Sequence, residues 1–325
     1  MTNLNDFSNK LKEEILKAKS IAIISHYLPD GDAIGSTLTM YGAVRKLNNA
    51  VTALRSDTIP TFLKFLPLID DLILYDEKSK FDLAIILDCG DEDRLGSKKS
   101  IIKNSKTSFL IDHHNNNPLF ANYNYVDNKA SSTCELVFDI VKLMGVSFCK
   151  DMAFSCLTGI LTDTNRFMYE NSSSSTLLKA AELIDTGLDK DYLIRNLYQK
   201  TSKQSFLINK ILVENTEFFF DGKFAFSYIS NEDLNKVGAT RDDLDDKISL
   251  IRDIEGVEIA ILVEDRFDEL KVGLRSKEYV NVSELARRFG GGGHNKASGF
   301  YYKSSIIDLK KDLMKEIEII LNENK

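Results

Sequence analysis

The sequence has few cysteines, and nothing in their arrangement predicts structural pairing. The four, Cys89, Cys134, Cys149 and Cys156, form no CxxC pair. A secretory signal peptide is also missing, and so is any run of about 18 apolar residues, the length that spans a bilayer. These absences predict an ordinary globular protein of the reducing cytoplasm that makes no contact with a membrane.

An excess of positive charge is missing as well. The formal net charge is -7 and the isoelectric point is about 5.3. This balance argues against a protein that binds long nucleic acid through a broad basic face, whereas a small anionic substrate held by metal ions is compatible with it. With 325 residues, of which 43% are hydrophobic, the chain is expected to form two domains.

Histidine is rare, and its placement is informative. The four histidines fall in three short segments, Ser25–Asp32, Asp112–His114 and Gly290–His294. Two of these segments also contain closely spaced aspartates. Because clustered imidazole and carboxylate groups bind divalent cations, the pattern predicts a metal-dependent hydrolytic site.

The first half of the chain predicts an α/β fold, a mostly parallel sheet with helices on both faces. Apolar runs at 21–24, 83–87 and 108–111 read as buried strands, and the pattern over 32–47 reads as a helix. A polar motif begins where each of these strands ends. Because ligands of open α/β sheets bind at the carboxyl ends of the strands, we expect these motifs to meet there.

The rest of the chain predicts helices followed by a smaller α/β domain. Expected helices cover 132–144, 151–161, 174–185 and 282–289; an Asp-Gly hairpin covers 218–226; further strands cover 257–263, 270–274 and 297–302. The segment after Gly187 looks helical and not like a flexible linker. We therefore expect a catalytic domain over 1–187, a helical connector over 188–215 and a second domain over 216–325.

His26, Asp30 and Asp32 lie within seven residues, separated by Pro29 and Gly31. Proline and glycine favour a tight loop that turns several side chains toward one point. Each of the three taken alone reads more simply as a surface loop residue or a helix cap. Their combination favours convergent metal ligands.

Five segments together resemble the DHH phosphoesterase family. They are HYLPDGDAIGS at 26–36, LDCGD at 87–91, DHH at 112–114, GILTDT at 159–164 and GGGGHNKASG at 290–299. The first four are similar to the motifs of the DHH domain, in the order in which the family has them. The fifth is similar to the signature of the DHH-associated domain, which binds substrate in this family.

The resemblance implies two divalent metal ions, most often Mn²⁺, with Mg²⁺ or Co²⁺ as alternatives. The implied ligands are His26, Asp30 and Asp88 for one ion, and Asp32, Asp88, His113 and Asp163 for the other. Asp88 would be shared. Such a pair of cations lowers the pKa of water and offsets the negative charge that builds on phosphorus.

Two further residues of the third motif are expected to act beside the ligands. By resemblance, His114 contacts the scissile phosphate and assists the leaving group, although a structural hydrogen bond is the simpler role. Asp112 is expected to orient a histidine ring or to hold the loop.

The glycine-rich segment predicts a substrate-binding surface. Consecutive glycines have an entropic cost, which suggests a backbone that must approach a ligand closely, although a flexible turn is the simpler explanation. We expect binding by glycine main chain, by the Arg275 guanidinium and by neighbouring side chains. The full expected set is Arg275, Ser276, Gly291, Gly292, Gly293, His294, Ala297 and Ser298.

The leading functional prediction is a DHH-family exonuclease of very short oligoribonucleotides that also dephosphorylates adenosine 3′,5′-bisphosphate. The nearest alternative is a soluble phosphodiesterase of cyclic di-AMP or of its linear product. A manganese pyrophosphatase, a single-strand DNA exonuclease, a non-catalytic nucleotide sensor and a structural scaffold fit less well. The expected partners are short oligoribonucleotides or small nucleotides, with no long duplex, and the sequence leaves a homodimer open.

Overall fold

The computed structural model describes residues 3–55, 58–244 and 247–323. The chain divides into two compact units, Met1–Lys200 and Thr201–Lys325. Helix α7 (Lys190–Tyr198) belongs to the first unit and α8 (Lys203–Glu214) to the second. The segment 188–215, expected as a connector, thus carries two helices, one in each unit.

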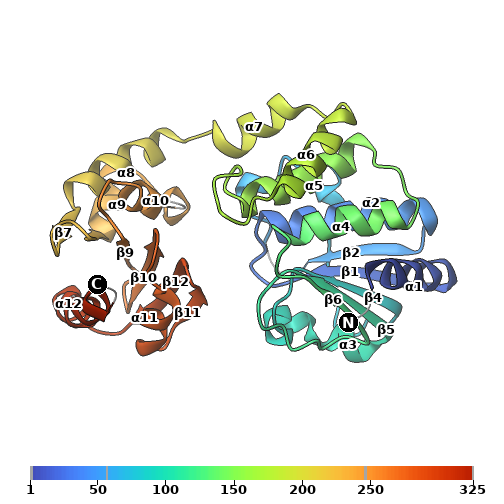
Figure 1. Ribbon diagram of the computed structural model, residues 1–325, viewed down its shortest axis with the longest axis horizontal. Coiled ribbons are helices and arrows are strands. Elements are labelled where there is room, and N and C mark those ends of the chain that lie inside the picture. Colours follow the sequence, from blue (N-terminus) through green and yellow to red (C-terminus); the bar gives the residue numbers. More distant parts are fainter. Residues whose placement is uncertain (1–2, 56–57, 245–246, 324–325) are drawn as a thin grey trace. The chain divides into compact units, whose positions relative to one another are not determined.

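A six-stranded sheet forms the centre of the first unit, with strand order β3-β2-β1-β4-β5-β6 (Figure 1). The strands are β1 (Ile21–Ser25), β2 (Val51–Arg55), β3 (Ile73–Leu74), β4 (Phe81–Leu87), β5 (Ser105–Asp112) and β6 (Tyr123–Val126). Every neighbouring pair is parallel. The predicted parallel sheet is confirmed, and the apolar runs lie on its central strands because both faces of those strands are buried.

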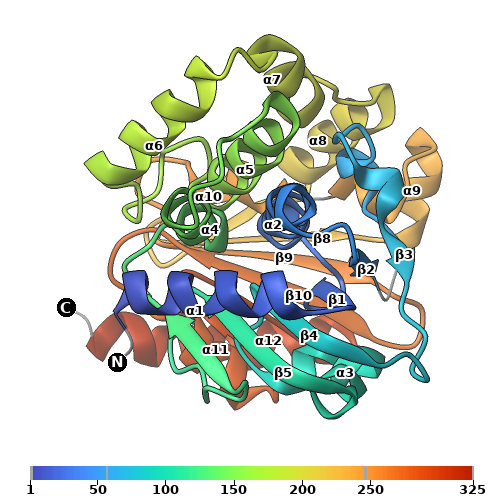
Figure 2. The ribbon, with the colours of Figure 1, turned by 90° about the vertical axis from the view of Figure 1, so that its right-hand side faces the viewer.

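Helices cover both faces of this sheet. One face carries α1 (Leu4–Lys17), α2 (Gly31–Leu47), α4 (Thr133–Leu143) and α5 (Lys150–Asp163), with α6 (Ser174–Asp185) packed on α5. The other carries the 3₁₀ segment η3 (Glu92–Lys99) and α3 (Ser100–Asn104). Figure 2 shows α2, α4 and α5 on one side of the strands and α3 on the other. Short 3₁₀ turns, η1 (Thr61–Leu63) and η2 (Ile69–Asp71), precede β3.

Glycines let α2 and α5 approach closely beside the carboxyl edge of the sheet. A Cβ at Gly159 would collide with Cys134 Sγ and would lie 2.7 Å from Asp32 Oδ1. One at Gly35 would lie 2.5 Å from the Ser155 carbonyl oxygen. The two helices are therefore locked at a spacing that side chains would not permit.

We expect Gly159→Ala to lower the free energy of unfolding by about 1–3 kcal/mol, because a methyl group must be forced between Cys134 and Asp32. Chemical denaturation of the purified variant measures this loss. Gly42→Ala on α2 is the matched comparison and should cost less, since its Cβ would lie 2.6 Å from Cγ of Met152, a flexible side chain that can move. Equal stability of Gly159→Ala and wild type would contradict the close approach of the helices.

The second unit contains a mixed six-stranded sheet with order β11-β12-β10-β9-β8-β7. The strands are β7 (Glu217–Phe219), β8 (Phe224–Ile229), β9 (Ile259–Asp265), β10 (Leu270–Ser276), β11 (Gly292–His294) and β12 (Ala297–Tyr302). Only β8 and β9 pair in parallel. The predicted hairpin joins β7 to β8, and its turn residues Phe220, Asp221 and Gly222 all have positive φ.

Two apolar clusters cover the two faces of this sheet. On one face lie α8 and α10 (Lys247–Arg252), with α9 (Asn231–Val237) and η4 (Arg241–Leu244) beside them. On the other face lie α11 (Val282–Arg288) and α12 (Ile306–Glu323) (Figure 1). Among the described residues of both units, no helix combines the length and apolar character needed to cross a bilayer.

Candidate metal centre

The predicted ligands gather at the carboxyl edge of the first sheet, where the strand order reverses. Strand β1 connects through α2 to β2 on one side, whereas the neighbouring β4 connects through α3 to β5 on the other. Diverging connections leave a crevice between two strand ends, and ligands of open α/β sheets bind there. The segment after β1 carries His26, the residue after β4 is Asp88, and His113 directly follows β5.

His26, Asp30 and Asp88 form one group of potential ligands. His26 Nε2 lies 3.5 Å from Asp88 Oδ2 and 4.0 Å from Asp30 Oδ2. The other ring nitrogen, Nδ1, lies 2.7 Å from the Tyr27 carbonyl oxygen, which can only accept a hydrogen bond. A proton on Nδ1 leaves the Nε2 lone pair directed toward the carboxylates, as a metal ligand requires.

Asp30 has two roles, one for each carboxylate oxygen. Its Oδ1 caps helix α2 by accepting from the backbone N–H groups of Asp32 and Ala33, at 3.1 and 3.0 Å. Its Oδ2 faces His26. The helix-cap role considered from the sequence is therefore present and is compatible with a ligand role.

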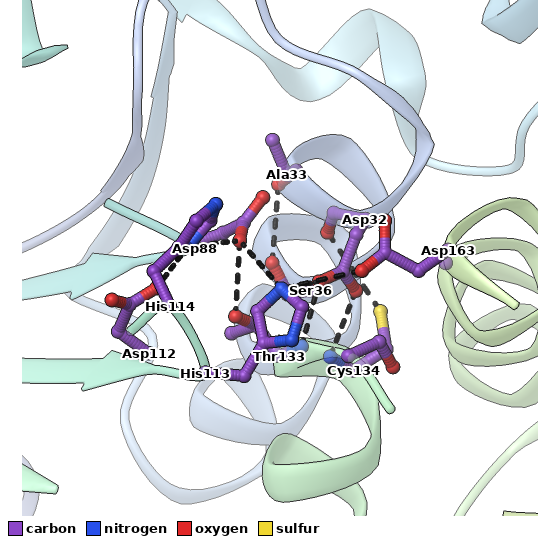
Figure 3. Close-up of polar contacts among 12 residues, drawn as sticks. Asp32, Ala33, Ser36, Asp88, Asp112, His113, His114, Thr133, Cys134 and Asp163 are labelled. Atoms are coloured by element: carbon purple, nitrogen blue, oxygen red, sulfur yellow. Dashed lines mark hydrogen bonds and ion pairs between the residues drawn. The ribbon is translucent and has the colours of Figure 1, made fainter. Parts of the chain in front are cut away.

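A second group consists of Asp32, His113 and Asp163. His113 Nε2 lies 3.2 Å from Asp163 Oδ2 and 3.9 Å from Asp32 Oδ2. Figure 3 shows the side chains of Asp88 and Asp163 directed at the ring of His113 from different sides. Asp32 lies on α2, Asp163 at the end of α5 and His113 in the loop after β5. The edge of the sheet therefore brings together three residues that are far apart in the sequence.

Asp88 lies between the two groups and faces both. Its Oδ2 is 3.5 Å from His26 Nε2, while its Oδ1 is 3.7 Å from His113 Nε2. The residue adopts a left-handed backbone conformation, with φ of 52°. This conformation is strained for most side chains but is tolerated by aspartate and asparagine.

Burial makes the charges of this centre costly. Asp32 is fully buried and Asp88 is 2% exposed. Burial raises the pKa of Asp32 well above its usual value, and the charges of Asp88 and Asp30 add to this. Burial likewise raises the pKa of Asp163, together with repulsion from Asp32. Burial opposes ionisation of Asp88 too, but its hydrogen bond with His26 and the charge of His113 lower its pKa overall.

This donor set fits two divalent cations. Four carboxylates and two imidazoles, all hard or borderline donors, converge around Asp32 and Asp88, which are buried, whereas Asp30 at the rim is exposed. Carboxylates repel one another strongly where water is excluded. A pair of cations would offset the negative charge that the protein's own groups do not compensate. The donors are His26, Asp30, Asp32, Asp88, His113 and Asp163.

His114 lies beside this centre and is held by Asp112. Its Nδ1 lies 2.8 Å from Asp112 Oδ1 and 3.6 Å from Asp88 Oδ1, so the nitrogen nearest the centre is already bonded to Asp112. Burial lowers the pKa of His114, but the bond to Asp112 and the charge of Asp88 outweigh it and raise the pKa to about 9. Asp112 Oδ2 accepts a further bond from the Asn117 amide at 2.6 Å.

Thr133 supports the centre but was not predicted from the sequence. Its hydroxyl donates to Asp88 Oδ1 at 3.1 Å, and its backbone N–H donates to Asp32 Oδ2 at 2.6 Å (Figure 3). The next N–H along α4, that of Cys134, donates to Asp32 Oδ1 at 2.9 Å. The amino end of α4 thus holds the Asp32 carboxylate, and the Thr133 side chain holds the Asp88 carboxylate.

We expect Thr133→Val to weaken Mn²⁺ binding by about 10- to 100-fold, because valine keeps the shape but loses the hydroxyl that orients Asp88. Calorimetric titration with Mn²⁺ measures the effect. Thr133→Ser, which keeps the hydroxyl, should restore binding to near the wild-type level. Wild-type affinity in Thr133→Val would show that this hydroxyl has no part in positioning Asp88.

Two cations of η3 also reach the segment that carries His26. Lys98 is 1% exposed, and its ammonium donates to the carbonyl oxygens of Ser25 at 2.7 Å and His26 at 3.2 Å. Arg94 Nη2 lies 3.4 Å from His26 Nδ1. Neither was predicted, because a lysine or arginine in a polar stretch gives no sign of burial or of its distant partners.

The expected substrate-binding residues all lie in the second unit, on and around β10, β11 and β12. Arg275 pairs with Ala297, and Ala297 pairs with His294, so these three lie in one row across the sheet. Ser276 and Ser298 are buried, and their hydroxyls donate to the carbonyl oxygens of Val280 and Val282 at 2.7 Å. Gly291, Gly292 and Gly293 precede or form β11.

Known families and proteins match this chain over both of its units. Family models match residues 20–161, described as the DHH family, N-terminal domain, and residues 221–323, described as the DHHA1 domain. A Thermus thermophilus protein named bifunctional oligoribonuclease and PAP phosphatase NrnA is 31% identical, over 97% of this chain and 94% of its own. A Bacillus subtilis protein of the same name is 27% identical, over 89% and 92%.

A solved structure shows the same arrangement of elements. The exopolyphosphatase-related protein from Bacteroides fragilis has a TM-score of 0.92 and 26% identity. The match covers 96% of this chain and 95% of that one.

Proposed function

This chain belongs to the DHH family of phosphoesterases, hydrolases of phosphoester bonds, and we propose that it degrades very short oligoribonucleotides to 5′-mononucleotides. We further propose that it dephosphorylates adenosine 3′,5′-bisphosphate to AMP. The observation that carries the proposal is Asp88, whose two oxygens face the two predicted ligand groups. The names of the relatives, oligoribonuclease and PAP phosphatase, support the choice of substrates.

We propose that the resident metals are two Mn²⁺ ions. One would be held by His26, Asp30 and Asp88, and the other by Asp32, Asp88, His113 and Asp163. When bound, such ions supply an activated water and offset the negative charge of the phosphoryl group during attack. A mixture of imidazole and carboxylate donors suits Mn²⁺, and Mg²⁺ is the competing choice where carboxylates dominate.

The chain's own residues have separate tasks in this proposal. Asp112 fixes the ring of His114 through Nδ1, and we assign Nε2, the other ring nitrogen, to contact with the substrate phosphate. The bond to Asp112 favours the protonated imidazole, which can donate to a phosphate oxygen and pass a proton to the leaving oxygen. Thr133 keeps Asp88 in place while charge builds up nearby.

The second unit supplies groups suited to the substrate's phosphate and base. The planar guanidinium of Arg275 can bind a phosphate through paired hydrogen bonds. His294 shares its row across the sheet and offers a ring N–H. The hydroxyls of Ser276 and Ser298 donate to main-chain carbonyl oxygens within the domain, and the Ser276 N–H donates to the Lys296 carbonyl oxygen, so we assign these two residues to holding the shape of the site.

A substrate panel tests the proposal. Purified protein with Mn²⁺ should hydrolyse a ribodinucleotide and adenosine 3′,5′-bisphosphate much faster than cyclic di-AMP or pyrophosphate. Faster cleavage of cyclic di-AMP would favour the phosphodiesterase alternative instead. If the protein bound one or more of these four compounds but hydrolysed none of them, it would be a nucleotide sensor instead.

We propose a cytoplasmic location, because all four cysteines are free thiols, as is usual in that reducing compartment.

A further inference from the structure

A row of three glycines crosses the sheet of the second unit. Gly273 on β10 pairs directly with Gly299 on β12, and Gly299 pairs with Gly292 on β11. Directly paired residues have their side-chain positions on the same face of a sheet. Across three adjacent strands, this face therefore consists of bare main chain, which we call the glycine floor.

Two of these glycines have no structural requirement to be glycine. A Cβ at Gly292 would meet no atom within 4 Å, and one at Gly273 would make only ordinary contacts, at 3.7 Å or more. Neither has a positive φ. Because glycine weakens a strand by about 0.5–1 kcal/mol relative to alanine, its presence at both positions points to a ligand that approaches the main chain closely.

Gly273 and Gly299 of the glycine floor line a groove with a volume of about 570 Å³, and Gly292 adjoins it through its pairing with Gly299. Its lining includes Arg275 and, on the other side of Gly273 along β10, Lys271. These two residues are four apart in the strand, roughly 13 Å, so a planar group can lie on the floor between them. Leu244 and Ile248 line the cavity as well, so the groove has both a polar and an apolar boundary.

The groove lining includes an exposed aromatic ring, and its charged residues are Lys271, Arg275 and Glu264. Tyr301 pairs with Lys271 across the sheet and is 59% exposed. Glu264 accepts from both Lys271 at 3.2 Å and Arg266 at 2.6 Å, so one carboxylate faces two cations. An aromatic ring beside a basic side chain is what single-stranded nucleic acid binds, through stacking and phosphate contact.

We propose that this groove holds two successive nucleosides of the substrate. One base lies flat on the glycine floor, and the next stacks on the ring of Tyr301, with Lys271 facing the phosphodiester between them. This subsite rests on the proposed function and explains a preference for two or more nucleotides. Because the floor and the ring contact only the faces of bases, the subsite is independent of base sequence.

Kinetics with two substrates test the Tyr301 subsite. Tyr301→Ala should raise KM for a ribodinucleotide about 10-fold and leave KM for adenosine 3′,5′-bisphosphate, which has one nucleoside, within about 2-fold. Tyr301→Phe should keep both values. Phe218→Ala is the matched control, because Phe218 is also half-exposed on a strand of this sheet but does not line the groove. Equal effects of Tyr301→Ala on the two substrates, or none on either, would overturn the proposal.

A second pair of variants tests the glycine floor. Gly273→Ala and Gly292→Ala should keep or raise Tm, because both methyl groups have room, yet should raise KM for both substrates several-fold. Unchanged KM in both would remove the floor from the proposal.

A binding measurement separates this inference from the proposed function. If wild-type protein cleaved neither substrate, calorimetric titration with the dinucleotide would still report the subsite. Tighter binding by wild type than by Tyr301→Ala would then support it, and equal binding would overturn it.

Discussion

Replacing Asp88 by asparagine is expected to reduce kcat/KM for a ribodinucleotide by about 1,000-fold or more. The two carboxylate oxygens face His26 and His113, and an amide offers only one oxygen and no charge. Both ligand groups therefore lose a donor in a single substitution. Steady-state kinetics with Mn²⁺ and the dinucleotide measure the loss.

Asparagine is the informative replacement because Asp88 has a left-handed backbone that asparagine also tolerates. The circular dichroism spectrum and Tm should show that the variant is folded. Asp93→Asn is the matched control, since its side chain is 83% exposed and forms an ion pair with Lys99; it should keep wild-type activity. Activity of Asp88→Asn within 10-fold of wild type would contradict the shared position of this residue.

Asp163→Asn is expected to raise the stability of the metal-free protein and to lower its hydrolytic activity with metal. In metal-free protein, Asp163 repels Asp32, Asp30 and Asp88 from a half-buried position, so its neutral replacement should raise Tm by a few degrees. The same change removes a donor that faces His113, and hydrolysis should fall by about 100-fold or more. Calorimetric Tm after chelation and kinetics with Mn²⁺ give the two values.

The opposite sign is expected for an aspartate at the other end of the same helix. Asp151 lies in the first turn of α5, where a negative charge is favourable, so Asp151→Asn should lower Tm slightly and leave hydrolysis unchanged. A metal-free Asp163→Asn protein that melts below wild type would show that repulsion among the carboxylates does not dominate this centre.

The ligand-bearing edge of the first sheet was predictable because local patterns determine it. The apolar run at 83–87 is long enough to form a buried strand, and Asp88 stands where that run stops. Loop chemistry likewise marks the end of β1, where Pro29 and Gly31 separate the polar residues. Parallel strands then bring the ends of such segments together, whatever their separation in sequence.

The supporting residues were not predictable because their roles depend on contacts distant in sequence. Thr133 donates to Asp32 from 101 residues away, and the Lys98 ammonium reaches Ser25 across 73 residues. No local pattern distinguishes these side chains from surface ones. Strand β11 was missed for another reason, since Gly292 and Gly293 have low strand propensity and pair with β12 only through tertiary context.

Which residues share a face of the second sheet also became clear only from the structure. The sequence places Arg275 and Ser276 side by side, but successive residues of a strand point to opposite faces. Arg275 therefore lines the groove over the glycine floor, whereas the Ser276 hydroxyl donates to Val280 on the far side.

The most direct test is the Mn²⁺-dependent hydrolysis of a labelled ribopentanucleotide and a labelled RNA of several tens of nucleotides by the same purified protein. We expect rapid release of mononucleotides from the pentanucleotide, slow attack on the long RNA, loss of activity after chelation and recovery when Mn²⁺ is restored. Equal rates on the two RNAs, or hydrolysis that survives removal of the metal, would contradict a metal-dependent exonuclease of short RNA.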